Sequence, residues 1–143
     1  MEKSKNRERL IKSKQRIRDH GEVYTPAHIV AAMCDMVAKN SDAFDRIDAK
    51  FLEPACGDGN FLVEILRRKL LLCKTDEEAI RAVKSIYAID LLPDNVQEAR
   101  QRMSAIVKEQ FPRADITGIL ERQIIQGNTL EIDIEKLWEE ETE

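Results

Sequence analysis

Two glycines and one aspartate are the residues whose types and spacing best suit ligand chemistry. Gly57 and Gly59 lie in the small-residue segment 53–60, directly after a short apolar run, and Asp90 ends a second apolar run. Glycine lets a backbone approach a ligand closely, and a carboxylate can accept hydrogen bonds from both hydroxyls of a ribose. The pattern indicates a site for a nucleoside-containing cofactor. A tight turn without a ligand remains an alternative for the glycines.

Alternating strands and helices must position these residues. Thr25 is expected to cap a helix that begins at Pro26, and Thr75 with Glu78 has the pattern of a capping box. The alternation predicts an α/β fold with about three parallel strands and flanking helices. Strands are expected at 51–52, 85–90 and 123–126, and helices at 26–40 (apolar at Ile29, Val30, Met33, Met36 and Val37), 61–70, 76–84, 93–111 and 131–138.

Composition restricts the class of protein. The 143 residues are 43% hydrophobic and 35% charged, which is too apolar for a disordered chain and fits one domain. No apolar run approaches the roughly 18 residues of a membrane span, and no signal-peptide core follows the N-terminus, so a cytoplasmic protein is expected. Three cysteines without a Cys-x-x-Cys pair indicate neither a disulfide framework nor a metal site.

The glycine segment departs from the dinucleotide-binding pattern. Leu62 occupies the third glycine position, and Asp90 follows Gly57 by 33 residues, whereas about 20 are typical of that pattern. A nicotinamide cofactor is therefore disfavoured, although the sequence does not exclude it.

Segment 51–62, Phe-Leu-Glu-Pro-Ala-Cys-Gly-Asp-Gly-Asn-Phe-Leu, resembles the S-adenosylmethionine motif of N6-adenine DNA methyltransferases from restriction-modification systems. Segments 21–26, 86–91 and 127–130 resemble three further motifs of this family in the expected order. The resemblance covers residues 19–130. It implies a Rossmann-like class I methyltransferase fold, truncated, with methyl transfer from S-adenosylmethionine to adenine in DNA.

The resemblance also implies roles for individual residues. Asp90 would hold the ribose, Leu91 would pack on the adenine and Asn128 would bind the adenine edge. Plain core packing for Leu91 and a turn role for Asn128 remain alternatives. The other implied cofactor residues face the methionine end and are Tyr24, Thr25, Pro26, Glu53, Pro54, Ala55, Cys56, Gly57 and Gly59. Tyr24 is alternatively a core aromatic, and Cys56 is interpreted as a small turn residue rather than a nucleophile.

The catalytic Asn-Pro-Pro-[Tyr/Phe] segment of these enzymes has no counterpart, because the prolines stand singly at 26, 54, 93 and 112. The resemblance implies a seven-stranded sheet in which the strand at 51–52 lies near the middle. In this chain that strand would be an edge that invites a second chain or self-association, unless the helix at 131–138 covers it. We expect a split or truncated methyltransferase, or alternatively a non-catalytic S-adenosylmethionine-binding or assembly module.

Charge is distributed unevenly along the chain. Residues 1–18 hold eight lysines and arginines against two glutamates, although the whole chain carries −4. Residues 1–19 are therefore expected to form a basic arm before a partial methyltransferase domain at 20–143. Such an arm favours phosphate-type contacts with DNA, and a solvated helix without a partner is the alternative.

Overall fold

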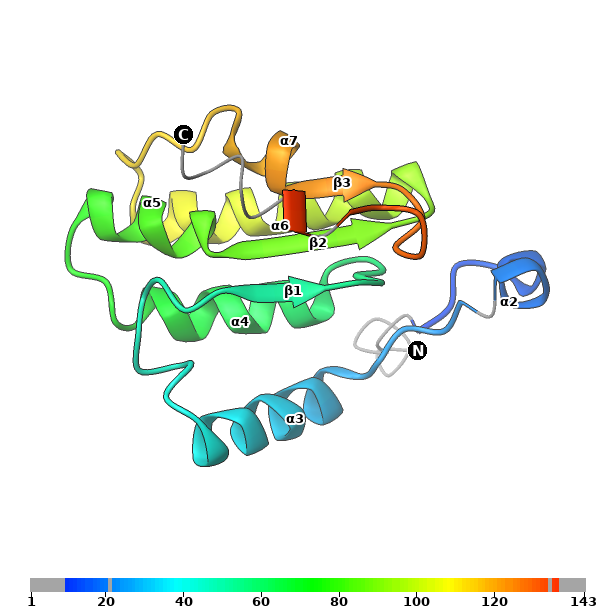
Figure 1. The fold of residues 1–143 in the computed structure, drawn as a ribbon, viewed down its shortest axis with the longest axis horizontal. Helices are drawn as coiled ribbons and strands as arrows, with labels where there is room; N and C mark the ends of the chain where they lie inside the picture. The colour runs from blue at the N-terminus through cyan, green and yellow to red at the C-terminus, as the bar shows by residue number, and fades with distance from the viewer. Residues whose placement is uncertain (1–9, 21, 134, 137–143) are drawn as a thin grey trace, which may run out of the picture.

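The computed structural model describes residues 10–20, 22–133 and 135–136 (Figure 1). Figure 1 shows the strands side by side, with α4 running behind β1 and α6 behind β2. The elements are α2 (Lys14–His20), α3 (Ala27–Asn40), β1 (Phe51–Glu53), α4 (Asn60–Leu70), α5 (Asp76–Lys84), β2 (Ile86–Asp90), α6 (Pro93–Gln110), α7 (Ile119–Gln123) and β3 (Ile124–Gln126).

The three strands form one parallel sheet in the order β1-β2-β3. Phe51 pairs with Ile86, and Asp90 at the end of β2 pairs with Gln126 at the end of β3. The predicted α/β fold with three parallel strands and flanking helices is confirmed. Because parallel strands end on one side of the sheet, the segments that follow β1, β2 and β3 meet there.

The core lies between the sheet and the helices α4 and α6. Apolar side chains at helical spacing on α6 are buried as the sequence predicts, and they are Val96, Ala99, Met103, Ile106 and Val107. Thr75 Oγ1 accepts a hydrogen bond from the Glu78 amide at 3.1 Å, which confirms the predicted cap of α5. Among the described helices, none is long and apolar enough to cross a bilayer.

The start of α3 differs from the prediction. The helix begins at Ala27 with Pro26 as its N-cap residue, and Thr25 does not cap it. The Thr25 carbonyl instead accepts a 2.8 Å hydrogen bond from Asn60 Nδ2, so a contact with α4 fixes this turn. Of the expected helix at 131–138, residues 131–133 are not helical, residues 135 and 136 are helical, and residues 134, 137 and 138 lie outside the described residues. The short helix α7 was not predicted.

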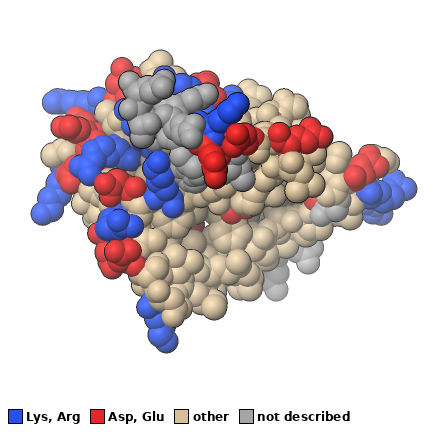
Figure 2. Space-filling view, viewed as in Figure 1, with Lys and Arg blue, Asp and Glu red and all other residues tan. Residues whose placement is uncertain are grey.

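The packing of α3 exposes much of its apolar surface. Val30 and Cys34 are buried, whereas Ile29, Met33, Met36 and Val37 remain 40–65% exposed. Figure 2 shows a largely uncharged stretch across the middle of one face of the molecule, between charged side chains at either end. Within the described chain, β1 is an edge strand as expected, since it pairs with β2 alone.

Candidate cofactor-binding site

A pocket of about 450 Å³ lies at the carboxyl ends of the strands. Four segments line it: residues 20 and 22–25, the turn after β1, the end of β2 and the turn after β3. The lining residues are His20, Glu22, Val23, Tyr24, Thr25, Glu53, Pro54, Ala55, Cys56, Gly57, Asp58, Asn60, Phe61, Asp90, Leu91, Leu92, Gly127, Asn128 and Thr129.

The turn after β1 depends on its two glycines for different reasons. Gly57 has φ +53°, and a Cβ there would lie 2.9 Å from the Tyr24 ring. Gly59 has φ +99°, and its Cβ would lie 3.1 Å from the Cα of Ala99 in α6. Gly57 therefore lets an aromatic ring lie against the pocket turn, whereas Gly59 lets α4 begin in contact with the α6 backbone.

Asp90 connects the turns that surround the pocket. Its Oδ2 accepts from the Gly57 amide at 2.9 Å, and its Oδ1 accepts from the Leu92 amide at 2.9 Å and from Asn95 Nδ2 at 3.1 Å. Its backbone carbonyl accepts from the Gly127 amide at 2.9 Å. One residue thus ties together the segments that follow all three strands.

Ten of the twelve residues expected to bind the cofactor line this pocket. The exceptions are Pro26, which begins α3, and Gly59, which packs against α6. Glu22, a lining residue that was not assigned to the cofactor, lies within the motif at 21–26 and could have been suspected from that position. Asn95 could not have been, because a single asparagine inside a helix carries no distinguishing pattern.

The structure bears on the alternative roles of Leu91, Tyr24 and Asn128. Leu91 is 51% exposed beside the pocket, so it is not a core residue. Tyr24 is buried and donates a 2.8 Å hydrogen bond to Asn95 Oδ1, so it belongs to the core and to the pocket wall together. Asn128 Oδ1 accepts from the Leu130 amide, which makes this residue a turn former that also lines the pocket.

Burial shifts the pKa values of ionisable groups in the pocket. Burial, together with the nearby carboxylates of Asp90 and Glu53, raises the pKa of the Cys56 thiol to about 12. This thiol therefore stays protonated at neutral pH, which supports a packing role over a nucleophilic one. Burial also raises the pKa values of Glu53 and Asp58, and a hydrogen bond from the Ala55 backbone partly offsets the effect for Glu53.

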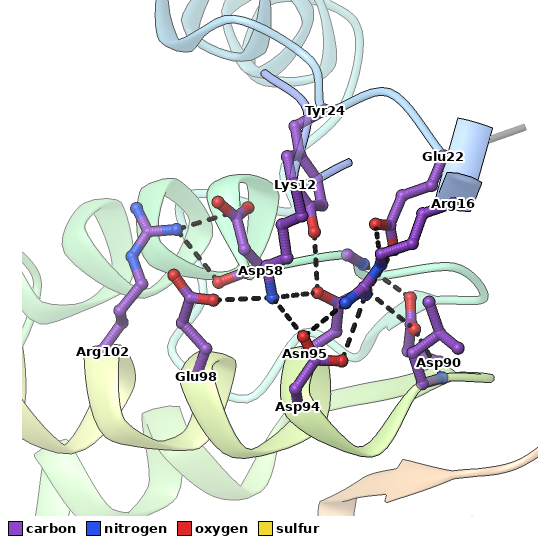
Figure 3. A network of polar contacts seen from close by, with 12 residues as sticks. Lys12, Arg16, Glu22, Tyr24, Asp58, Asp90, Asp94, Asn95, Glu98 and Arg102 are labelled. Carbon is purple, nitrogen blue, oxygen red and sulfur yellow. Dashed lines mark hydrogen bonds and ion pairs between the residues drawn. The ribbon is translucent and has the colours of Figure 1, made fainter. Parts of the chain in front are cut away.

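The described part of the basic segment is attached to the rest of the chain. Lys12 Nζ lies 2.9 Å from Asp94 and 2.9 Å from Glu98, and Arg16 pairs with both Asp94 and Glu22 at 2.6 Å (Figure 3). Burial by itself raises the pKa of Glu22, but hydrogen bonds from Arg16 and Asn95 outweigh it and hold that pKa below its ordinary value. These two basic residues therefore contact Glu22 beside the pocket and the first turns of α6, so they are not the solvated residues without contacts that the alternative expects.

Comparison with known proteins decides the family. Residues 8–138 match the N-6 DNA Methylase family, which is most of the chain. The chain belongs to the N-6 DNA methylase family. One relative is the Type II methyltransferase M.BstVI of Geobacillus stearothermophilus, with 28% identity over 131 residues that cover 87% of this chain and 22% of that protein.

Two further likenesses agree with this family assignment. The Type II restriction enzyme and methyltransferase RM.BcgI of Heyndrickxia coagulans is 34% identical over 73 residues, which are 50% of this chain and 10% of that protein. MmeI, a Type IIL restriction-modification enzyme solved in complex with DNA, shares the fold with a TM-score of 0.53 and 20% identity over 92% of this chain and 23% of its own. This N-6 DNA methylase chain thus has the Rossmann-like methyltransferase fold and spans less than a quarter of each relative's length.

Proposed function

We propose that this chain is the cofactor-binding portion of an N6-adenine DNA methyltransferase and that its pocket binds S-adenosylmethionine. The observation that carries the proposal is the convergence of four sequence segments, each resembling a motif of the family, on one pocket at the carboxyl ends of the strands. This edge is where nucleoside cofactors bind in open α/β sheets.

The charge of the pocket supports S-adenosylmethionine over a dinucleotide. The described lining residues include four carboxylates and neither lysine nor arginine. Glu22 is paired with Arg16 and Asp58 with Arg102, so Glu53 and Asp90 are the carboxylates that supply the acidic character. S-adenosylmethionine carries a sulfonium and an ammonium against one carboxylate, whereas a dinucleotide brings an anionic pyrophosphate. An acidic pocket stabilises the former and repels the latter.

Each part of the pocket has a proposed contact. Asp90 accepts hydrogen bonds from the ribose, exposed Leu91 packs against the adenine, and Asn128 binds the adenine edge. Glu53 and the turn after β1 face the ammonium and carboxylate of the methionine part, and Thr25 closes that end. When bound, the cofactor supplies a methyl group activated by its sulfonium.

Titration of S-adenosylmethionine into the 143-residue chain by calorimetry tests this proposal. We expect saturable binding that Asp90→Ala weakens by roughly 2 kcal/mol, because hydrogen bonds to a charged group are lost. Asp45→Ala, which removes an exposed aspartate that does not line the pocket, should leave the affinity unchanged. A folded chain that does not bind, or binding indifferent to Asp90→Ala, contradicts the proposal. NADH serves as the competing ligand, and tighter binding of NADH than of S-adenosylmethionine contradicts it also.

Transfer to adenine requires groups that hold the flipped base, and the sequence has no Asn-Pro-Pro segment. We propose that a further polypeptide segment supplies them and adds to the edge strand β1. The exposed apolar side chains of α3 and the largely uncharged stretch across the middle of the face in Figure 2 support a protein surface that is covered in the assembled enzyme. A non-catalytic module is the second candidate, and a neighbouring reading frame encoding Asn-Pro-Pro-[Tyr/Phe] would distinguish the two.

If β1 is an edge strand that a further segment normally covers, the chain should self-associate when it is studied without a partner. Sedimentation velocity over a concentration series should show a rising sedimentation coefficient, because unpaired edges and exposed apolar side chains pair with other copies. Met33→Lys and Met36→Lys on α3 should reduce the association, whereas Lys39→Glu on the same helix, as a charged control, should not. A clean monomer at high concentration speaks against an open edge.

DNA contact through residues 1–18 stays a proposal that rests on charge. Lys12 and Arg16 are engaged with Asp94, Glu98 and Glu22, whereas Lys14 and Arg18 are exposed. Of the described basic residues in this segment, Lys14 and Arg18 are therefore the better candidates for phosphate contacts.

A further inference from the structure

Asn95, in the first turns of α6, is fully buried beside the pocket and has four polar contacts. Its Oδ1 accepts from Lys12 Nζ at 2.6 Å and from the Tyr24 hydroxyl at 2.8 Å. Its Nδ2 donates to Glu22 Oε2 at 2.6 Å and to Asp90 Oδ1 at 3.1 Å. Figure 3 shows the amide at the centre of these side chains. Because a primary amide offers two donors and two acceptor sites, the hydrogen-bonding capacity of Asn95 is used completely.

The surroundings permit one orientation of this amide. If the group were turned over, its oxygen would lie against two carboxylates and its NH₂ would lie against an ammonium. Lys12 and Tyr24 therefore direct Nδ2 toward Asp90 and Glu22. The Tyr24 amide also donates to the Leu10 carbonyl at 2.6 Å, and Lys12 donates to Asn95 Oδ1, so residues 10–12 are joined through Tyr24 and Asn95 to Asp90.

We propose that Asn95 is a positioning residue of the cofactor site, which fixes the carboxylate of Asp90 and couples it to the docked residues 10–20 and 22–24. This inference rests on the proposed binding of S-adenosylmethionine. Oδ1 of Asp90 accepts hydrogen bonds from the Leu92 amide and from Asn95, whereas Oδ2 accepts one from the Gly57 amide. Asn95 therefore leaves acceptor capacity for a ligand hydroxyl mainly on Oδ2.

A double-mutant cycle tests whether Asn95 acts through Asp90. The four chains are the parent, Asn95→Asp, Asp90→Ala and the double variant, each titrated with S-adenosylmethionine by calorimetry. Asn95→Asp keeps the size of the side chain and its acceptor oxygen but replaces the donor that faces Asp90 with a carboxylate oxygen, which lies against both Asp90 and Glu22. We expect a roughly tenfold loss of affinity in the parent and less than a twofold loss in the Asp90→Ala background, because coupled residues are not additive. Asn40→Asp, the same substitution at an exposed helix end, should change the affinity less than twofold.

The outcomes separate this inference from the proposed function. If Asp90→Ala leaves the affinity unchanged, the proposed cofactor site itself is wrong. If Asp90→Ala and Asn95→Asp each weaken binding and their effects multiply, Asp90 binds the cofactor without help from Asn95, and the inference is overturned. Equal affinity of Asn95→Asp and the parent overturns it too.

Tyr24→Phe provides a second variant where Asn95→Asp does not fold, as judged by circular dichroism. It removes one of the two donors that orient the amide and keeps the ring against Gly57. We expect a severalfold loss of affinity in the parent and none in the Asp90→Ala background. The same loss in both backgrounds overturns the inference.

Discussion

Lys69→Met is expected to lower the free energy of unfolding by about 3 kcal/mol, because buried carbonyl groups lose their donor. Lys69 is fully buried in α4, and its Nζ donates to the carbonyls of Ala49 at 2.7 Å, Ile47 at 2.8 Å and Arg46 at 3.4 Å. It also lies 5.0 Å from the centre of the Phe51 ring. Methionine fills a similar volume and avoids the cost of burying a charge, so the expected loss comes from the carbonyls. Urea denaturation at pH 7 measures it.

The loss caused by Lys69→Met should grow with pH. Burial lowers the pKa of Lys69 from 10.5 to about 8, with the charge of Asp48 opposing the shift. Between pH 8 and pH 10.5 the unfolded chain holds more protons at Lys69 than the folded chain does. The contribution of Lys69 to the free energy of unfolding therefore rises as pH rises through this range. Methionine at position 69 does not titrate and lacks this contribution. The buried thiols, whose pKa values are raised, are present in both the parent and the variant, so their effect on stability cancels when the two are compared.

Lys39→Met is the matched control, because Lys39 is exposed at the end of α3. It should change the free energy of unfolding by less than about 0.5 kcal/mol. A difference between parent and Lys69→Met that stays constant or narrows from pH 7.5 to pH 9.5 contradicts the expected titration of Lys69.

Gly59→Ala should also cost about 3 kcal/mol of stability, from two sources of similar size. The left-handed backbone at φ +99° disfavours any side chain, and the new Cβ meets the Ala99 backbone at 3.1 Å, where α6 cannot yield easily. Because Gly59 does not line the pocket, its effect on S-adenosylmethionine affinity should follow from lost folding rather than from a lost contact. Thermal unfolding with and without the ligand separates these effects.

Gly118→Ala isolates the contribution of the contact with α6. Gly118 has φ +78°, and nothing lies within 4 Å of the position its Cβ would take. This substitution therefore introduces backbone strain alone, at about 1.5 kcal/mol. Equal destabilisation by the two substitutions would mean that α6 adjusts to the new methyl group at Gly59.

The sequence alone determined those features that depend on neighbours along the chain. Gly57 and Gly59 predicted a turn, and Thr75 with Glu78 predicted the start of a helix. The spacing of apolar residues from Val96 to Val107 predicted the buried side of α6. Local hydrogen bonds and helical periodicity decide each of these, so the alternation of strands and helices, and with it the parallel sheet, could be predicted. Asp90 could be assigned to the side of the sheet where the carboxyl ends of the strands meet, because it ends an apolar strand.

Only the tertiary structure decided which side chains meet across the fold. The periodicity of α3 predicted a helix but not that Val30 and Cys34 would be its buried side, because that depends on where α4 lies. A lysine such as Lys69 is ordinarily placed on the surface, and it is buried here because carbonyls from the 46–49 loop surround its end. The contacts of Lys12 with Asp94 and Asn95 join residues more than 80 positions apart. The sequence does not reveal which distant residue a charged or amide side chain will contact, because the distances that set such interactions arise only when the chain folds.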